Sequence, residues 1–370
     1  MLKRIYVHNY KCLVNFELRL GELALLLGSN GAGKSSVLDV VFALRQILSG
    51  AAKITDAEAF PGHTLTVWQT SPLQVFELEV ELSDTGPLTY RLEVEHERET
   101  ARARVALERL TATSGPLFEF RMGEVQLYRD NHSLGPKFPG DWSESWLAHL
   151  VPRKQNPRPT RFLDFVRKII VSGIYPHGIV SESRSEASLL TRDGSNFAAW
   201  YRSLVQERPD LLSEYIAALT NIIAGFKGIR LQQVGLEARV LVVAFEGSEG
   251  RYELNLDLIS DGQRALIVLY ALLHLAGSQG HALLLDEPDN YVALPEIQPW
   301  LMALSDACGE TIPQAILCSH HPELIDYLGP EHGIVLEREG AGPVTTRALA
   351  DRKLEGALKL SESVARGWDR

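Results

Sequence analysis

The sequence predicts an α/β fold that also contains an antiparallel β subdomain and a helical lobe. An apolar segment at residues 22–27 leads into a glycine-rich loop and then into an amphipathic stretch with helical spacing. A second apolar segment, residues 282–285, ends in two acidic residues. Between these segments, residues 75–128 place apolar side chains at a period of two, which is typical of antiparallel strands.

The first part of the chain is expected to form short strands and a helix, followed by an irregular connection and a meander. The expected elements are strands 2–7, 14–20 and 22–27, helix 35–48, connection 53–64, and meander strands 75–82, 88–95, 102–110 and 124–128. The turn Asp84-Thr85-Gly86-Pro87 separates the first two meander strands. Residues 135–159 are rich in proline, and we expect a loop-like insertion there that is mobile or contacts a partner.

The rest of the chain alternates between helical patterns and short apolar strands. Helices are expected at 161–171 (ending in a short strand), 197–208, 211–223, 262–276, 295–308 and 354–364, and strands at 240–245, 251–256, 282–285, 314–318 and 333–336. We expect one domain over 1–370. In it, 1–134 and 277–350 form the α/β core and antiparallel lobe, 135–276 form the helical lobe, and 351–370 form a helical tail.

Composition narrows the class of protein. The 37 Lys and Arg residues against 47 Asp and Glu residues give a net charge of −10, which disfavours a general nucleic-acid coat but leaves a local basic patch open. Three cysteines without a CxxC pair disfavour a disulfide framework or a structural zinc site and indicate a reducing compartment. The sequence has neither a membrane-spanning apolar run nor a secretory signal pattern, so we expect a cytoplasmic protein without membrane contact.

Residues 28–35, Gly-Ser-Asn-Gly-Ala-Gly-Lys-Ser, match the phosphate-loop pattern GxxxxGK[ST] at every position, between an expected strand and an expected helix. Lys34 would place its charge between the β- and γ-phosphates of ATP, and the Ser35 hydroxyl would be a Mg²⁺ ligand. The residues predicted to hold the nucleotide here are Asn30, Gly31, Ala32, Gly33, Lys34, Ser35 and Ser36. The simpler alternative is an ordinary glycine turn between a strand and a helix.

Asp286 and Glu287 follow the apolar strand 282–285. Carboxylates at the C-terminal end of a strand lie where α/β sheets bind ligands. We predict that Asp286 holds Mg²⁺ through water and that Glu287 orients and deprotonates the attacking water. Taken alone, an apolar strand that ends in Asp-Glu is common, and a surface turn is then the simpler explanation.

The segment Ile259-Ser260-Asp261-Gly262-Gln263 resembles the LSGGQ signature of ABC-class ATPases. The resemblance implies an ABC-ATPase head, a P-loop NTPase with a mixed sheet. It also implies a homodimer through two ATP sites, in which Ser260, Gly262 and Gln263 contact the ATP of the other chain. Ser260 and Gln263 also fit a capping box, so a capped core helix is the alternative. Asp261 departs from the first Gly of the pair, which leaves the tightness of this contact open.

Three further segments resemble ATPases of the RecF, SMC and OLD type, including short bacterial AAA-family, AbiEii-like proteins. They are residues 7–13 (Val-His-Asn-Tyr-Lys-Cys-Leu), 190–197 (Leu-Thr-Arg-Asp-Gly-Ser-Asn-Phe) and 318–322 (Cys-Ser-His-His-Pro). In the last one, His320 aligns with the switch histidine that contacts the γ-phosphate. We therefore predict Glu287, His320 and Lys34 as the catalytic residues. A purely structural histidine is the alternative.

Some features of the family find no match. Residues 289–295 lack the Leu-His-Pro His, Ala293 lies near the place of the D-loop Asp, and Gln69 is only one candidate for the Q-loop glutamine. We see no coiled coil, and the chain ends at Arg370 without a Toprim domain. We therefore expect a bare ATPase head whose further chemistry belongs to a partner chain.

The predicted function is ATP binding and hydrolysis that drive an ATP-sandwich dimer switch, acting as a DNA-associated or phage-defence regulator with a partner effector. DNA contact is one option for a set of basic residues: Arg153, Lys154, Arg158, Arg161, Arg167 and Lys168. Two other functions stay open. They are the ATP-binding subunit of a membrane transporter and an ATP-dependent scaffold that does not hydrolyse ATP.

Overall fold

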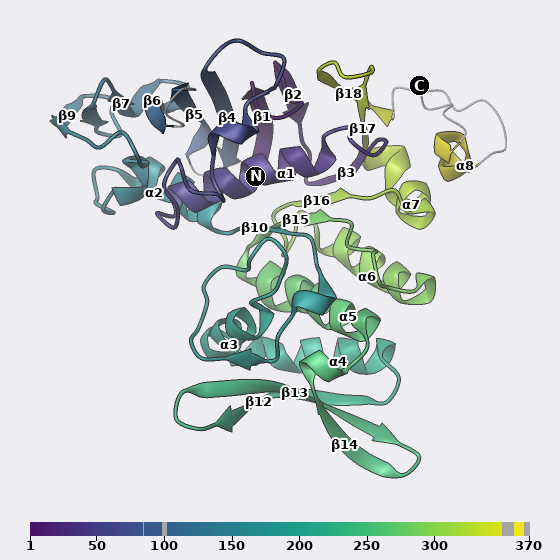
Figure 1. Cartoon of the computed structure of the whole chain (residues 1–370). Helices are drawn as coiled ribbons and strands as arrows, with labels where there is room; N and C mark the ends of the chain where they lie inside the picture. The colour runs from purple at the N-terminus through teal and green to yellow at the C-terminus, as the bar shows by residue number, and fades with distance from the viewer. Residues whose placement is uncertain (84, 98–101, 350–358, 366–370) are drawn as a thin grey trace. The chain divides into compact units, whose positions relative to one another are not determined.

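The computed structural model describes residues 1–83, 85–97, 102–349 and 359–365. The chain divides into two compact units, whose elements are labelled in Figure 1. Unit 1 comprises Met1–Ile169 and His332–Arg352, and unit 2 comprises Ile170–Glu331 and Lys353–Arg370. The expected organisation as one domain over 1–370 stays a prediction. Within the described ranges, no helix is long and apolar enough to cross a membrane.

Unit 1 contains an eight-stranded antiparallel sheet in the order β2-β1-β4-β5-β6-β7-β8-β9. Its strands are β1 (Leu2–His8), β2 (Phe16–Arg19), β4 (Leu73–Leu82), β5 (Gly86–Glu97), β6 (Arg102–Ala112), β7 (Gly115–Arg121), β8 (Glu124–Tyr128) and β9 (Leu134–Pro139). From β4 onward each strand pairs with the next, as expected for a meander. Leu88, Tyr90, Leu92 and Val94 alternate along β5 and are fully buried, so the period of two reflects one buried face.

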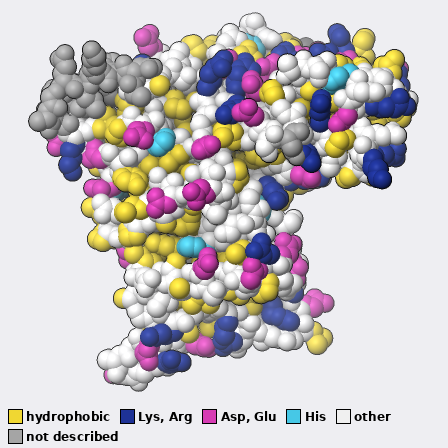
Figure 2. Space-filling view, turned by 180° about the vertical axis from the view of Figure 1, so that it is seen from behind, with side chains coloured by type: hydrophobic (Ala, Val, Ile, Leu, Met, Phe, Trp, Pro, Cys, Tyr) yellow, Lys and Arg dark blue, Asp and Glu magenta, His cyan; other side chains and the backbone are white. Residues whose placement is uncertain are grey.

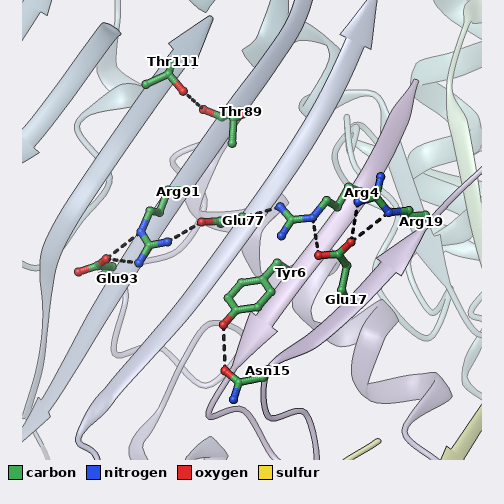
Figure 3. A network of polar contacts seen from close by, with 10 residues as sticks. All are labelled: Arg4, Tyr6, Asn15, Glu17, Arg19, Glu77, Thr89, Arg91, Glu93 and Thr111. Carbon is green, nitrogen blue, oxygen red and sulfur yellow. Dashed lines mark hydrogen bonds and ion pairs between the residues drawn. The ribbon is translucent and has the colours of Figure 1, made fainter. Parts of the chain in front are cut away.

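The other face of this sheet carries a row of ion pairs across β2, β1, β4 and β5, shown in Figure 3. Glu77 lies between two arginines on the neighbouring strands, Arg4 at 2.8 Å on one side and Arg91 on the other. Arg4 also pairs with Glu17 at 2.9 Å. Because a shift of one residue would turn these charges toward the apolar face, the row helps to fix the strand register.

A second group of strands in unit 1 positions the phosphate loop. The fully buried β3 (Leu23–Leu27) lies parallel to β17 (Gly333–Arg338), and β18 (Val344–Ala348) pairs antiparallel with β17, so this sheet is mixed, as predicted. Helix α1 (Lys34–Leu48) follows the loop, and α2 (Pro157–Arg167) contacts it. Arg45 of α1 is buried and donates to the carbonyl of Ile169 at 2.8 Å. Burial lowers the pKa of this guanidinium to about 10, against the opposing effect of Glu58.

Unit 2 contains buried strands and helices that pack on one another. Its helices are α3 (Phe197–Glu207), α4 (Leu212–Ile222), α5 (Asp261–Ala271), α6 (Leu294–Ala307), α7 (Pro322–His332) and α8 (Leu360–Ala365). Helix α5 continues into a π-helical turn, η6 (Leu272–Ala276). Buried strands β15 (Ala282–Asp286) and β16 (Ala315–Cys318) are parallel, and β10 (Ile169–Ser172) enters this unit. The indole N–H of Trp300 and the hydroxyl of Tyr215 donate to carbonyls of α5, which ties α6 and α4 to it.

A smaller antiparallel sheet completes unit 2. It is formed by β11 (Glu182–Ser183), β12 (Phe226–Val234), β13 (Ala238–Gly247) and β14 (Gly250–Asn255). The hairpin expected at 240–245 and 251–256 is therefore confirmed. Exposed ion pairs join its strands, such as Arg230 with Glu253 at 2.6 Å.

The structure corrects several sequence predictions. Strands β7, β12 and β18 and helix α7 were not predicted, and β9 occupies part of the segment expected to be a loop. Strand β9 was not predicted because it contains Pro136 and Pro139, and proline is compatible with a strand only at a sheet edge or a strand end. The structure places β9 at the edge of its sheet, where these prolines are tolerated. The expected helix 354–364 lies largely outside the described residues, and its described part begins at Leu360. Asp84 of the predicted turn also lies outside them.

Candidate functional site

The phosphate loop lies in unit 1 and joins β3 to α1. Asn30, Gly31 and Ser35 are exposed, whereas Ala32 and Lys34 are buried. Gly33 is the N-cap of α1, and no side chain caps the helix. The first N–H groups of α1 and the positive end of its dipole are therefore directed at the loop, which is the arrangement that binds phosphate. The Lys34 ammonium donates to the carbonyl of Gly28 at 2.6 Å, so its charge lies inside the loop.

Three positions of the loop require glycine for different physical reasons. Gly28, Gly31 and Gly33 have φ of 144°, 82° and 97°, a region that favours glycine. A Cβ on Gly28 would clash with the carbonyl of Leu336, and one on Gly33 would lie 3.0 Å from Cys12 Sγ. A Cβ on Gly31 would meet no protein atom within 4 Å, so Gly31 leaves its side of the loop open to a ligand.

The acidic pair lies in unit 2 at the end of β15. Glu287 has φ of 48°, and its N–H donates to the carbonyl of Cys318 at 2.8 Å. One carboxylate oxygen of Glu287 lies 3.1 Å from His320 Nδ1, and the other accepts from the Asn290 side chain at 2.8 Å. A non-glycine residue in this strained region persists where the surroundings hold it, and such positions cluster at active sites. The structure thus brings two of the predicted residues, Glu287 and His320, into direct contact.

Asp286 has a partner of its own, Arg192. Its Oδ2 accepts from Arg192 Nη2 at 2.8 Å, and both side chains are largely buried. The arginine lies on loop 190–196, where the Asn196 side chain accepts from the N–H and hydroxyl of Thr191. The Arg192 carbonyl also accepts from the N–H of Gly173, directly after β10. A Cβ on Gly173 would lie 3.2 Å from Arg192 Nη1, so this glycine gives the guanidinium room beside Asp286.

The same loop contains a second ordered carboxylate. Burial raises the pKa of Asp193, but hydrogen bonds outweigh that effect, and the net pKa lies below its usual range. The donors include the N–H and hydroxyl of Ser195 and the hydroxyl of Thr191. Asp193 therefore stabilises the turn that carries Arg192.

The signature-like segment begins α5. Ser260 is the N-cap, its hydroxyl accepts from the N–H of Gln263, and the Gln263 side chain accepts from the N–H of Ser260, each at 3.3 Å. The predicted capping box is therefore present. A Cβ on Gly262 would lie 2.9 Å from the carbonyl of Tyr291, which explains glycine at this position. Asp261, which replaces the usual first glycine, lies 3.0 Å from His177 Nδ1 and 3.2 Å from Arg264 Nη2.

The predicted site residues are divided between the two units. Asp286, Glu287 and His320 belong to unit 2, as do Ser260, Gly262 and Gln263, whereas residues 30–36 belong to unit 1. Sequence analysis missed Arg192, Asn290 and His177. Arg192 lay inside the family-like segment 190–197 but was given no role, and the other two had no local pattern to mark them. The roles of all these residues, and of Gln69, stay predictions.

Comparisons with known proteins show the family of this chain and proteins that are similar to it. The model of the family described as "AAA domain, putative AbiEii toxin, Type IV TA system" matches residues 23–326. The OLD nuclease of Thermus scotoductus is 46% identical over 41 residues, a match that covers 11% of this chain and only 8% of that protein.

Two solved SMC heads are similar in fold. One is an SMC head bound to the C-terminal winged-helix domain of ScpA, with TM-score 0.55 and 12% identity, covering 95% of this chain and 99% of that one. The other is the SMC head with an extended coiled coil bound to the C-terminal domain of ScpA, derived from Pyrococcus furiosus. Its TM-score is 0.58 at 11% identity, and the match covers 100% of this chain and 99% of that one.

The family model gives the class of protein, an AAA-type ATPase, and the solved structures show that its fold is that of an SMC head. The chain belongs to the family of AAA domains described as AbiEii-like, and it resembles the RecF, SMC and OLD ATPases.

Proposed function

We propose that the protein binds MgATP at residues 28–36 and hydrolyses it with Glu287 as the general base. The observation that carries the proposal is the phosphate loop, in which an uncapped helix begins at a glycine-rich turn and a buried lysine points into that turn. Family membership supports a nucleotide substrate.

The residues at the end of β15 support hydrolysis. Glu287 is held by His320 and Asn290, so its carboxylate has a fixed orientation from which it can accept a proton from water. Ser35 and Asp286 supply oxygen atoms, the ligand type that Mg²⁺ prefers. Bound Mg²⁺ would neutralise charge on the phosphates. His320 would contact the γ-phosphate, and Lys34 would hold the β- and γ-phosphates in place.

We further propose that two chains close around two ATP molecules, with Ser260, Gly262 and Gln263 of each chain contacting the ATP of the other. The resemblance to ABC-class ATPases motivates this proposal. Because the γ-phosphate would be contacted by both chains, its loss would open the dimer. A role as a DNA-associated or phage-defence regulator with a partner effector rests on the AbiEii-like family and on the short match to the OLD nuclease.

Turnover and binding measured on paired variants test the enzymatic part. We expect Lys34→Ala to lose both ATP binding and phosphate release, because the charge inside the loop is removed. Glu287→Gln should keep ATP binding but lower turnover by about 10²–10⁴-fold, the usual contribution of a general base.

The matched controls for these two variants are Lys137→Ala and Glu310→Gln, at exposed positions of units 1 and 2. Wild-type turnover in Lys34→Ala would overturn the assignment of the loop. If the wild type binds ATP but does not hydrolyse it, the alternative function as an ATP-dependent scaffold would be favoured.

A further inference from the structure

Unit 1 contains a cavity that the nucleotide chemistry does not use. It measures about 400 Å³ and is bounded by β7, β8 and β9 on one side and by residues 146–159 on the other. Figure 1 shows β7, β9 and α2 together at this end of the unit. In the sheet order, β8 and β9 lie at the opposite edge from β2 and β1. This volume is within the range of small-molecule sites.

The lining combines flat rings with positive charge. Tyr128, Phe138 and Trp146 supply partly exposed rings, whereas Phe118 is buried. Arg129 and Arg153 supply two permanent charges. Among the described lining residues none is acidic, although the chain as a whole carries a net charge of −10. The nearby Asp130 faces Arg158 at 3.9 Å instead. Rings and arginines without carboxylates favour a ligand that is both planar and anionic.

The walls of the cavity are fixed by hydrogen bonds. Glu108 of β6 is fully buried and accepts from the Ser145 hydroxyl at 2.5 Å, the Trp146 N–H at 2.9 Å and the Tyr90 hydroxyl at 3.0 Å. At the other end of the segment, the Asn156 side chain accepts from the N–H of Arg153 at 2.7 Å and donates to the carbonyl of Val151 at 3.1 Å. Such ordering before binding lowers the entropy cost of holding a ligand.

We propose that this cavity is a second ligand site that binds a nucleobase together with its phosphate. The base would lie among the aromatic rings, and the phosphate would face Arg129 and Arg153. A free mononucleotide and the end of a single strand present the same chemistry. Part of the basic set seen in the sequence is used elsewhere, since Arg158 faces Asp130 and Arg167 donates to the carbonyl of Ala148. The ligand of this site would therefore be a single nucleotide unit rather than the surface of a double helix.

Calorimetric titration of the full chain tests the site with two probes, AMP and a 5′-phosphorylated hexathymidylate, at 150 mM salt. Both the wild type and Lys34→Ala are titrated, since binding in this cavity does not use the phosphate loop. We expect Arg153→Glu to weaken binding by at least about tenfold, and Phe138→Leu to weaken it by a similar factor through lost stacking. Lys154→Glu is the matched control, because Lys154 is the exposed neighbour of Arg153 but does not line the cavity.

The outcomes separate the sources of the ligand. Tighter binding of AMP than of the oligonucleotide assigns the site to a free nucleotide, and the reverse order assigns it to a strand end. Binding that disappears in Lys34→Ala, or that falls equally in Arg153→Glu and Lys154→Glu, would overturn the proposal. So would the lack of saturable binding by both probes to the wild type and to Lys34→Ala, even if MgATP binds the wild type normally.

Discussion

The ion pair between Arg192 and Asp286 joins loop 190–196 of unit 2 to Asp286, the predicted metal ligand. The Arg192 guanidinium donates to Oδ2 of Asp286 at 2.8 Å, and this bond orients the carboxylate. Partners of this kind fix the direction of a metal-ligating carboxylate, and their loss commonly lowers metal affinity. We therefore expect Arg192 to be a positioning residue. A mutant of it should change the affinity for the metal rather than the affinity for the nucleotide alone.

We expect Arg192→Ala to lower the affinity of the ATP-loaded protein for Mn²⁺ by about tenfold, because Asp286 loses its orientation. Arg192→Lys should restore part of it, since the charge returns without the planar guanidinium. Paramagnetic resonance of free Mn²⁺ measures this without turnover. The control is Arg208→Ala, which removes an exposed pair with Asp210. Tighter Mn²⁺ binding in Arg192→Ala would mean that the arginine competes with the metal instead.

Helix α5 and its π-helical turn show how burial controls stability at the scale of an element. His274 lies in this turn, stacks on Tyr270 at 6.0 Å, and is half-buried. Burial lowers the pKa of the imidazole, and the carboxylate of Glu214 opposes this effect. The unfolded chain, with a histidine pKa of about 6.5, therefore takes up a proton before the folded chain does. The neutral imidazole stabilises the fold fully above pH 6.5, and this contribution is lost as the pH falls from there toward the folded pKa.

We expect the urea midpoint of the wild type to fall between pH 7.5 and 5.5, and that of His274→Gln to fall less. One proton changes the free energy of unfolding by at most about 1.4 kcal/mol per pH unit, which sets the upper limit of the difference. His63→Gln, at an exposed position of unit 1, is the control. Parallel pH dependence of His274→Gln and the wild type would contradict this account.

Elements with strong local signals were predictable, and those defined by distant contacts were not. The phosphate loop and α1 follow from glycine spacing and helical periodicity, and the β4–β6 meander follows from alternation. Strand β9 was hidden by two prolines, which an edge position tolerates. In the site, Asp286 and Glu287 stood out as acids after an apolar run. Arg192 could not be identified in this way, because its predicted role depends on its contact with Asp286, which is far away in the sequence.

At the scale of the whole molecule, the charge distribution bears on what the surface can bind. Figure 2 shows basic and acidic side chains interspersed over the face in view. Pairs such as Arg230 with Glu253 and Lys227 with Glu246 neutralise each other on the small sheet of unit 2. Mixed charges with a net charge of −10 do not attract a duplex over a broad area, so recognition of nucleic acid would require a local site.

The proposed dimer switch makes a prediction about mass. Asp261 would bring negative charge to the start of α5, but the Arg264 guanidinium lies 3.2 Å from its carboxylate, and this positive charge reduces its repulsion of a phosphate from a second chain. We expect Glu287→Gln, which should bind MgATP without hydrolysing it, to change from the mass of one chain to that of two when MgATP is added, as measured by light scattering. MgADP should leave the mass unchanged, because only the γ-phosphate is contacted from both sides. Adding Ser260→Arg should block the change while ATP binding persists, since the larger side chain would occupy the contact. A double mass without nucleotide would mean that the dimer is constitutive, and a single mass under every condition would exclude the sandwich for this chain alone.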